Sequence, residues 1–341
     1  MSVEVGLSKG EANHMAQINE ILLLLYFALI ISVNGEYAGE WEQGLLENGY
    51  SYRNGTSSLR RVLVVTLTSV KRKNYYRAVS ETYMTELPVA MITEKGTPKC
   101  KLCGSREREG SSTALYSRTR FDEHKERSPG LPYYGWKSVD WKCAQQRPLQ
   151  ALKMALTDFK ERRHEWLLLI DDDAYVHGEH VLRMIRGLND SKSIMFGNRI
   201  GGGAGFLMSS GAVQAFLQPS GNKVYFWDVD GRKWQEKEDD EATVVLDKCI
   251  EASVGGRYCF FHSDWLIKRC ADAAGVKVEP LSNMYQNCPR GIQGLANSTD
   301  AFDNDTAEAV LSSSMWRNLL TCHRISPRTI RGLHKIKVSQ K

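Results

Sequence analysis

Short runs of consecutive hydrophobic residues alternate with amphipathic segments along much of the chain. Two runs are continuously hydrophobic, which is typical of strands buried on both faces of a sheet: RVLVVTLT at Arg61–Thr68, and WLLLI at the start of Trp166–Val176. Between them, the pattern predicts a helix over Tyr75–Leu87, a short strand over Val89–Thr93 and a helix over Leu149–Arg163. Alternating strands and helices predict an α/β fold built around a largely parallel sheet.

The N-terminal part contains one longer hydrophobic segment. Ile21–Val33 reads ILLLLYFALIISV, thirteen residues without a charge, which matches the hydrophobic region of a signal peptide or a single signal-anchor. A buried core helix of the same length is the alternative. No stretch reaches the roughly 18 apolar residues that identify a membrane span, so a polytopic membrane protein is excluded. We expect a targeting segment and stem over residues 1–58 and one catalytic domain over residues 59–341.

Composition and cysteine content narrow the class of protein. The 45 Lys and Arg residues against 40 Asp and Glu give a net charge of +5, which argues against a dedicated nucleic-acid partner. The eight cysteines and the Asn-x-Ser/Thr sequons favour a disulfide-bonded glycoprotein of an oxidising lumen. A zinc site at Cys100 and Cys103 is the weaker alternative, because no partner pair follows at zinc-ligand spacing. Eight cysteines allow about 105 pairings, so the sequence assigns none.

Three adjacent carboxylates follow the second hydrophobic run directly. Asp171, Asp172 and Asp173 lie where a parallel strand ends, which is where α/β sheets bind ligands. In an extended backbone, Asp171 and Asp173 point to the same side, and Asp172 points away. Carboxylate oxygens suit hard cations such as Mn²⁺ or Mg²⁺, which bind diphosphate oxygens in turn. The pattern therefore predicts a metal-diphosphate site, with a solvated acidic turn as the alternative.

A glycine-rich stretch follows further along the chain. Gly201–Gly205 reads GGGAG, and the missing side chains would let the backbone approach a sugar closely. A tight turn between two elements is an equally good interpretation. A second acidic cluster, Asp239–Glu241, supplies candidates for a general base.

Together these motifs resemble the fringe-like family of inverting β1,3-glycosyltransferases, which are related to the core-1 galactosyltransferases. The similarity rests on the hydrophobic strand ending in three Asp and followed by Ala-Tyr-Val, on GGGAGF at Gly201–Phe206, and on the strand and basic residues of Val64–Lys73. It extends from about Leu59 to His262, and further to His323 if the C-terminal histidine is included. The resemblance implies the nucleotide-sugar-binding type A glycosyltransferase fold.

The resemblance also implies roles for individual residues. Counting back from Phe261-His262-Ser263 places the catalytic base on Asp240, or on Glu241 if the register slips by one residue. The metal ligands expected are Asp171 and Asp173, with His262 as a candidate for the third. The residues expected to bind the nucleotide sugar are Thr66, Thr68, Lys73, Arg77, Asp172, Gly202 and Gly203.

Two positions depart from the family pattern. Val244-Val245 stands where the family has a glycine, and Asp264 stands where fringe proteins have the second histidine of Phe-His-Ser-His. That second histidine is the ligand that the resemblance implies, so the third metal ligand stays open between Asp264, His262 and His323, the last by similarity to core-1 enzymes.

The sequence thus predicts a Mn²⁺-dependent enzyme that moves a hexose or N-acetylhexosamine from a UDP-sugar to a hydroxyl of a glycan or glycoprotein in β1,3 linkage. We expect it in the Golgi or ER lumen, secreted or held by one N-terminal anchor. The departures leave a non-catalytic glycan- or UDP-sugar-binding protein on the same fold as the main alternative. A metal-dependent phosphoester hydrolase is a third interpretation of the same carboxylates.

Overall fold

A mixed seven-stranded sheet forms the centre of the molecule, in the order β1-β3-β2-β4-β7-β6-β10. The computed structural model describes residues 41–55, 61–95, 144–197, 203–219, 226–227, 233–234, 243–255, 263–297 and 311–339. Strand β2 (Val62–Leu67) runs parallel to both β3 (Val89–Ile92) and β4 (Trp166–Asp171). Strand β7 (Phe206–Ser209) is antiparallel to β4 and to β6 (Ile194–Gly197), and β10 (Lys277–Pro280) runs parallel to β6. The predicted α/β class is confirmed.

The central strands are buried on both faces, as their continuous hydrophobic runs predict. On β4, Trp166, Leu168 and Ile170 belong to one hydrophobic cluster. The side chains of Leu167 and Leu169 belong to the other. This alternation follows from the two-residue period of a strand, and it fixes the end of β4 between two packed layers.

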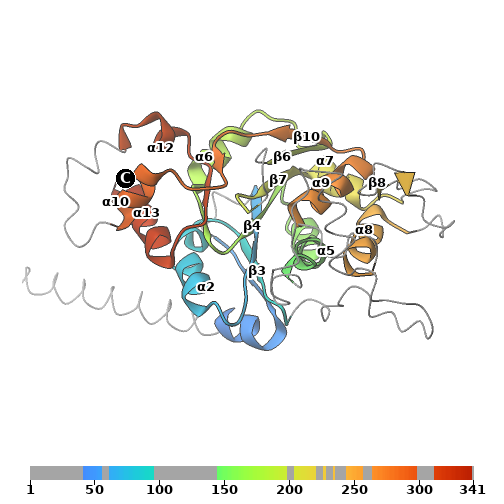
Figure 1. The fold of residues 1–341 in the computed structure, drawn as a ribbon, viewed down its shortest axis with the longest axis horizontal. Helices are drawn as coiled ribbons and strands as arrows, with labels where there is room; N and C mark the ends of the chain where they lie inside the picture. The colour runs from blue at the N-terminus through green and yellow to red at the C-terminus, as the bar shows by residue number, and fades with distance from the viewer. Residues whose placement is uncertain are drawn as a thin grey trace, which may run out of the picture.

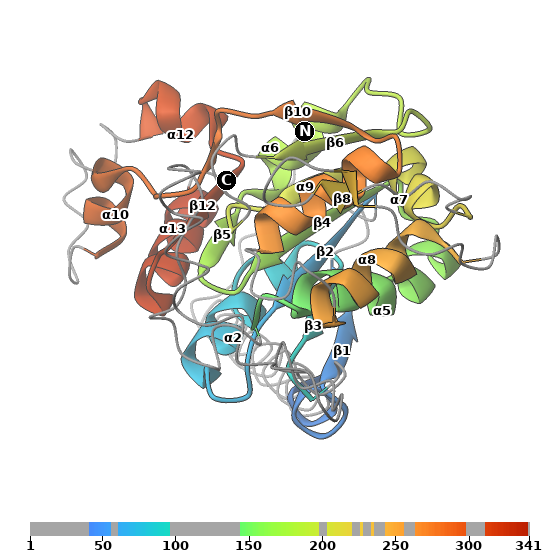
Figure 2. The same cartoon turned by 45° about the vertical axis from the view of Figure 1, so that its right-hand side comes forward.

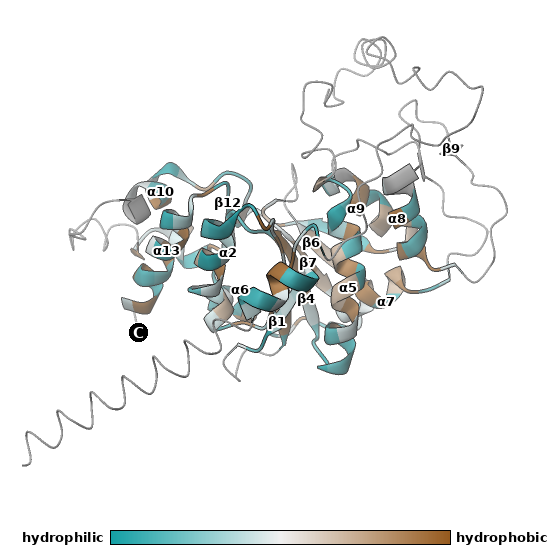
Figure 3. Ribbon diagram, turned by 90° about the horizontal axis from the view of Figure 1, so that it is seen from below, coloured by the Kyte–Doolittle hydropathy of each residue, from teal (hydrophilic) through white to brown (hydrophobic). Residues whose placement is uncertain are grey.

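Helices cover both faces of the sheet (Figure 1). One layer contains α2 (Lys73–Ser80), α6 (Gly178–Ile185) and α13 (Pro327–Ser339), and the other contains α5 (Arg147–Glu161), α7 (Ser210–Phe216), α8 (Val245–Gly255) and α9 (Ser263–Ala273). Figure 2 shows α5, α8 and α9 together on the same side of β4. Brown and teal residues alternate along these helices in Figure 3, as expected of helices with one buried side.

Helix boundaries differ slightly from the sequence prediction. The segment predicted as one helix over Tyr75–Leu87 ends as α2 at Ser80 and continues as the 3-10 turn η2 (Tyr83–Thr85). Thr82 donates its hydroxyl to the Ala78 carbonyl at 2.7 Å, a side-chain bond that replaces a backbone bond and favours the helix end.

Part of the expected stem packs on the sheet. Residues 41–48 are helical, and Gly49, with a φ of 71°, reverses the chain into β1 (Tyr50–Arg53). Strand β1 pairs antiparallel with β3 as the edge of the sheet. Trp41 and Leu45 are buried in the hydrophobic cluster beside α2. The boundary at residues 58 and 59 stays a prediction, while residues 41–53 contribute to the folded core.

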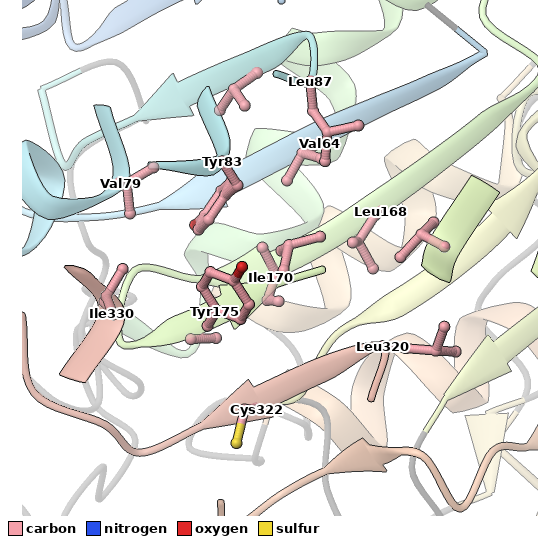
Figure 4. Packing of buried hydrophobic residues seen from close by; sticks show 14 of the residues in the cluster. Val64, Val79, Tyr83, Leu87, Leu168, Ile170, Tyr175, Leu320, Cys322 and Ile330 are labelled. Atoms are coloured by element: carbon pink, nitrogen blue, oxygen red, sulfur yellow. The ribbon is translucent and has the colours of Figure 1, made fainter. Parts of the chain in front are cut away.

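A second, three-stranded sheet lies against the first helix layer. It has the order β11-β12-β5, formed by β11 (Met284–Tyr285), β12 (Thr321–His323) and β5 (Ala174–Val176). Figure 4 shows Tyr175 of β5 packed close to Tyr83 and Ile170, and the Tyr83 and Tyr175 rings meet edge to face at 6.5 Å. This small sheet brings the C-terminal part of the chain to the end of β4.

The remaining described elements are shorter or peripheral. They are the hairpin strands β8 (Phe226–Trp227) and β9 (Lys233–Trp234) and the helices α10 (Arg290–Asn297) and α12 (Ser314–Asn318). The four described cysteines form two disulfides, Cys249–Cys270 and Cys288–Cys322, whose pairing the sequence did not assign. Within the described ranges, no helix is both long and hydrophobic enough to span a bilayer. The predicted targeting segment Ile21–Val33 and the Cys100–Cys103 pair lie outside the described residues.

Candidate metal centre

The three predicted carboxylates lie at the carboxyl end of β4, in the centre of the main sheet. Asp171 is the last residue of the strand, and Asp172 and Asp173 form the turn into β5. The Asp172 amide donates to the Leu67 carbonyl at 3.0 Å, which ties this turn to the neighbouring end of β2. We call residues 171–173 the acidic turn.

His323 completes a group of possible ligands with the acidic turn. Its Nε2 atom lies 3.0 Å from Asp173 Oδ1 and 3.6 Å from Asp171 Oδ2. Among the described residues, Asp171, Asp173 and His323 form a group whose ligand atoms all lie within 4.8 Å of one another. His323 reaches this place because it pairs with Ala174, the residue after Asp173, in the antiparallel ladder of β12 and β5.

The carboxylates of Asp171 and Asp173 point to the same side, as the sequence predicts, but the backbone conformation differs from the predicted one. The prediction assumed an extended backbone, whereas the chain turns at Asp172 and Asp173. The turn directs both flanking carboxylates toward His323 while the Asp172 carboxylate is buried on the other side.

The hydrogen bonds of His323 suit a metal ligand. Its Nδ1 atom lies 3.2 Å from the Gln286 carbonyl oxygen, which only accepts, so Nδ1 carries the proton in this contact. The other ring nitrogen, Nε2, faces the carboxylates, and loss of its proton would free a lone pair for a cation. Histidines that bind metals usually donate their other ring N–H to a carbonyl or carboxylate in this way, because that bond fixes the tautomer and the ring orientation.

Asp172 binds protein groups instead of facing the ligand cluster. Thr68 donates its hydroxyl to Asp172 Oδ2 at 2.5 Å, and Arg72 lies 2.9 Å from Asp172 Oδ1. The Arg72 guanidinium also lies 3.6 Å from Asp173 Oδ2 and stacks over the Tyr75 ring at 4.0 Å. The two oxygens of Asp173 are therefore divided, with one toward Arg72 and the other toward His323.

The pKa shifts follow from this crowding of charges. Burial raises the pKa of Asp172 to about 7, although Arg72 and Thr68 oppose the shift. Burial lowers the pKa of His323, but hydrogen bonds to Asp171 and Asp173 outweigh it and raise the value to about 9. Without a cation, His323 is therefore protonated and neutralises part of the carboxylate charge, a role that a divalent ion would take over.

The glycine-rich stretch packs directly on His323. A Cβ atom at Gly203 would lie only 2.1 Å from His323 Cε1, so no larger residue fits there without displacing the imidazole. The Thr321 hydroxyl donates a hydrogen bond to the carbonyl of the neighbouring Ala204, at 2.5 Å. At least one glycine of the motif therefore serves the close approach of two protein segments.

Two of the basic residues expected to bind the nucleotide sugar contact Glu42. Lys73 lies 3.7 Å and Arg77 3.2 Å from its carboxylate, and both cations are about half exposed. Thr66 is fully buried near the Tyr83 hydroxyl, at 3.5 Å. Their nucleotide-sugar roles stay predictions.

Other predicted residues fall outside the described part of the chain. Asp240, Glu241, Gly202 and His262 lie there, so the base and the His262 ligand stay predictions. Asp264, the departure from the family pattern, is buried in the first turn of α9 and contributes negative charge near Asp171.

Sequence reasoning did not single out Arg72, which reaches two of the three carboxylates. The available signal was its position in a basic run directly after β2, since the carboxyl ends of the parallel strands β2 and β4 meet at the same edge of the sheet. His323 was one of three open alternatives, and its contact with the acidic turn depends on strand pairing across about half the chain.

The donor set fits a divalent cation. Two carboxylate oxygens and one imidazole nitrogen suit Mn²⁺ and related hard or borderline ions. His323 is buried, and its contact with Gln286 turns Nε2 toward the two carboxylates. The residues that would hold the ion are Asp171, Asp173 and His323.

Comparison with known proteins agrees with the motifs. The Fringe-like family model matches residues 134–200, which include α5, β4 and the acidic turn. A search of curated protein sequences found no significant match. Among solved structures, the chain is similar to a glycosyltransferase involved in the glycosylation of the major capsid of PBCV-1, with 11% identity, a TM-score of 0.38, and coverage of 81% of this chain and 98% of that one.

The family match supports a glycosyltransferase activity. The mixed α/β sheet with ligand groups at the end of β4 fits the type A fold that the resemblance implied. The resemblance to fringe-like glycosyltransferases that the sequence motifs indicated is thus confirmed by the Fringe-like match over residues 134–200.

Proposed function

We propose that this protein is a divalent-metal-dependent inverting glycosyltransferase. It transfers a hexose or N-acetylhexosamine from a UDP-sugar to a hydroxyl of a glycan or glycoprotein in β1,3 linkage, in the Golgi or ER lumen. Two disulfides among the described residues suit that oxidising compartment. The observation that carries the proposal is the Asp171, Asp173 and His323 group at the end of the strand within the Fringe-like match.

The metal, when bound, supplies positive charge that neutralises the diphosphate of the leaving UDP. Asp171 and Asp173 would hold the ion from the end of β4, and His323 would hold it from β12. Arg72 keeps Asp172 and one oxygen of Asp173 in place. Because the carboxylates are anchored in the central sheet, they are positioned before the substrate binds, which reduces the cost of ordering the site.

The transfer itself is a single displacement. The acceptor hydroxyl oxygen attacks the anomeric carbon as the bond to the diphosphate oxygen breaks, and the hydroxyl proton passes to a carboxylate. We assign this base to Asp240 from the family resemblance, with Glu241 as the neighbouring candidate. The attack on the face opposite to UDP inverts the anomeric configuration.

The test is UDP release and sugar transfer from a panel of UDP-sugars by the purified protein, with and without Mn²⁺. Metal-dependent UDP release from one donor, with a β-linked product on an acceptor, is the expected result. Asp240→Asn should then lose turnover while it keeps UDP and Mn²⁺ binding, and Glu241→Gln is the matched control that keeps activity. Unchanged turnover in Asp240→Asn would refute the base assignment, and loss only in Glu241→Gln would move it by one residue.

The alternative function is a non-catalytic UDP-sugar- or glycan-binding protein on the same fold. It predicts Mn²⁺-dependent UDP binding without release of UDP from any donor in the panel. The reasons for this alternative were the departures at Val244 and Asp264. A histidine nitrogen from His323 in the same group of possible ligands argues against the second of these reasons.

A further inference from the structure

His323 belongs to a short strand whose two sides have different contacts. In β12, Thr321 and His323 point to one side, because residues two apart share a face of a strand. On that side, Thr321 bonds Ala204 and the His323 ring lies against Gly203 and the acidic turn. Cys322 lies between them and forms a disulfide with Cys288, with a Cα–Cα distance of 4.9 Å.

The segment before α10 holds His323 through three separate links. Gln286 accepts the imidazole N–H at its carbonyl, at 3.2 Å. Cys288 donates its backbone N–H to the His323 carbonyl at 3.2 Å. The disulfide joins Cys288 to Cys322, the residue next to the histidine. All three links connect residues 286–288 with residues 322–323, and the covalent link keeps the two hydrogen-bonding partners opposite each other.

The strand pairings around His323 are short. Strand β12 pairs antiparallel with β5 over three residues, and it pairs parallel with β11 over two, at Met284–Thr321 and Tyr285–Cys322. Short strand pairs are marginally stable in water, so packing or covalent links must hold them. The adjoining Arg324 adopts a left-handed conformation, with a φ of 60°, which is costly for a residue other than glycine. The chain therefore leaves β12 sharply, immediately after the ligand.

We propose that the Cys288–Cys322 disulfide is a positioning device for the metal ligand His323. Pairing with β5 brings His323 to the acidic turn, and the disulfide holds residues 286–288 against β12 so that the Gln286 contact aims Nε2 at Asp171 and Asp173. The bond is therefore needed for metal affinity beyond its contribution to stability. Gly203 completes the same arrangement from the opposite side by leaving room for the ring. This inference rests on the metal centre of the proposed function and assigns to it residues that do not touch the metal.

The molecule contains its own matched control. The second disulfide, Cys249–Cys270, is also buried but joins α8 to α9. Removing either disulfide should lower the melting temperature. Only Cys288→Ala/Cys322→Ala should weaken Mn²⁺ binding, by about tenfold or more, which is the size of effect known for groups that orient metal ligands. Cys249→Ala/Cys270→Ala should keep its Mn²⁺ affinity within about twofold.

Mn²⁺ affinity is measured on the purified chain by calorimetry or by electron paramagnetic resonance of free Mn²⁺, without substrate. Equal affinity of the two double variants would overturn the proposal. If Cys288→Ala/Cys322→Ala does not fold, Gly203→Ala replaces it, with the disulfide intact. Its methyl group would meet the His323 ring, whereas a methyl group in the control Gly294→Ala meets no atom within 4 Å. An affinity in Gly203→Ala equal to that of Gly294→Ala would then overturn the arrangement that we propose.

The failure of the inference is distinguishable from failure of the metal centre itself. Loss of Mn²⁺ binding in His323→Ala together with full binding in Cys288→Ala/Cys322→Ala would refute the positioning role and leave the metal centre standing. Absence of Mn²⁺ binding in the unaltered protein would reject the metal centre, and the positioning role with it.

Discussion

The two sides of the metal centre are built in different ways. The acidic turn continues a six-residue strand that is hydrogen-bonded to β2 and β7 on its two edges and buried on both faces. His323 comes from a three-residue strand that pairs with the short strand β5 and is linked to residues 286–288 by a disulfide and hydrogen bonds. The carboxylates are thus positioned by the main core, whereas the histidine depends on a small sheet and on local cross-links. Changes near the histidine should therefore affect metal binding more selectively.

The strongest expected effect is on the ligands themselves. Asp173→Asn and His323→Ala should each weaken Mn²⁺ binding by about 100-fold or more, because each removes one of three protein ligands. The two variants should differ in stability, since His323→Ala also leaves the Gln286 carbonyl without its donor. Calorimetric Mn²⁺ titration and thermal unfolding in EDTA check both statements. Similar Mn²⁺ affinities in the unaltered protein and His323→Ala would return the third ligand to Asp264 or His262.

A substitution of Arg72 tests how strongly the carboxylate side of the metal centre depends on a neighbouring positive charge. In Arg72→Met the buried Asp172 carboxylate loses its cation, and we expect the free energy of unfolding to fall by about 2 kcal/mol, below the usual 3–5 because Arg72 is partly exposed. Thr68 still bonds Asp172, so Mn²⁺ affinity should fall only a few-fold. Chemical denaturation in EDTA provides the measurement. If Arg72→Met lost more Mn²⁺ affinity than His323→Ala, the proposed difference between the two sides of the metal centre would be contradicted.

A pair of histidines offers a pH test of the segment that leads to β12. His177 and His180 stack at 3.5 Å, and their backbone and ring atoms bond the carbonyls of Leu320 and Leu319. Burial lowers the pKa of His177 to about 2. Because the folded pKa lies below the unfolded value near 6.5, the unfolded chain binds the proton more tightly, and stability falls as the pH decreases below about 6.5.

The expected slope from His177 alone is about 1.4 kcal/mol per pH unit below that value. Denaturation curves at pH 7.5, 6.0 and 5.0 measure it. His177→Gln should flatten the curve relative to the unaltered protein, and Arg186→Gln, at the exposed end of α6, should not. Parallel curves for the unaltered protein and His177→Gln would show that His177 does not titrate with folding.

Arg77 should give the smallest effect. Its ion pair with Glu42 is partly exposed to solvent, so Arg77→Met should lower the free energy of unfolding by about 0.5 kcal/mol and leave Mn²⁺ affinity unchanged. Measured beside Arg72→Met, it separates two arginines of similar sequence context, one in the site and the other on the surface. A marked loss of UDP affinity in Arg77→Met would support the nucleotide-binding role that the family resemblance implies.

Local pattern was sufficient for strands β2, β3 and β4 and for the carboxylates. The unbroken hydrophobic run before Asp171 predicted a strand buried on both faces, because such short runs are typical of strands in a parallel sheet. A strand of that kind lies inside the sheet, and its carboxyl end is an expected place for a ligand. The position of the acidic residues at that end was therefore predicted from the amino-acid sequence alone.

The partners of those carboxylates depended on tertiary structure. Arg72 reaches Asp172 because β2 and β4 are neighbours, and His323 reaches Asp173 because β12 pairs with β5. Both contacts join residues about 100 or more positions apart in the sequence. The pattern of a single chain does not record such pairings, since many arrangements of the same elements bury similar hydrophobic area.

The fold class, the buried strand and the acidic turn could thus be inferred from the spacing of adjacent residues. The contact of His323 with Asp173, at 3.0 Å, arises only in the folded chain. It also showed that a glycine of the GGGAG stretch is required by the histidine ring packed against it. The physical reason is that a metal centre is assembled by strand pairing and packing between distant segments, which act only once the chain has folded.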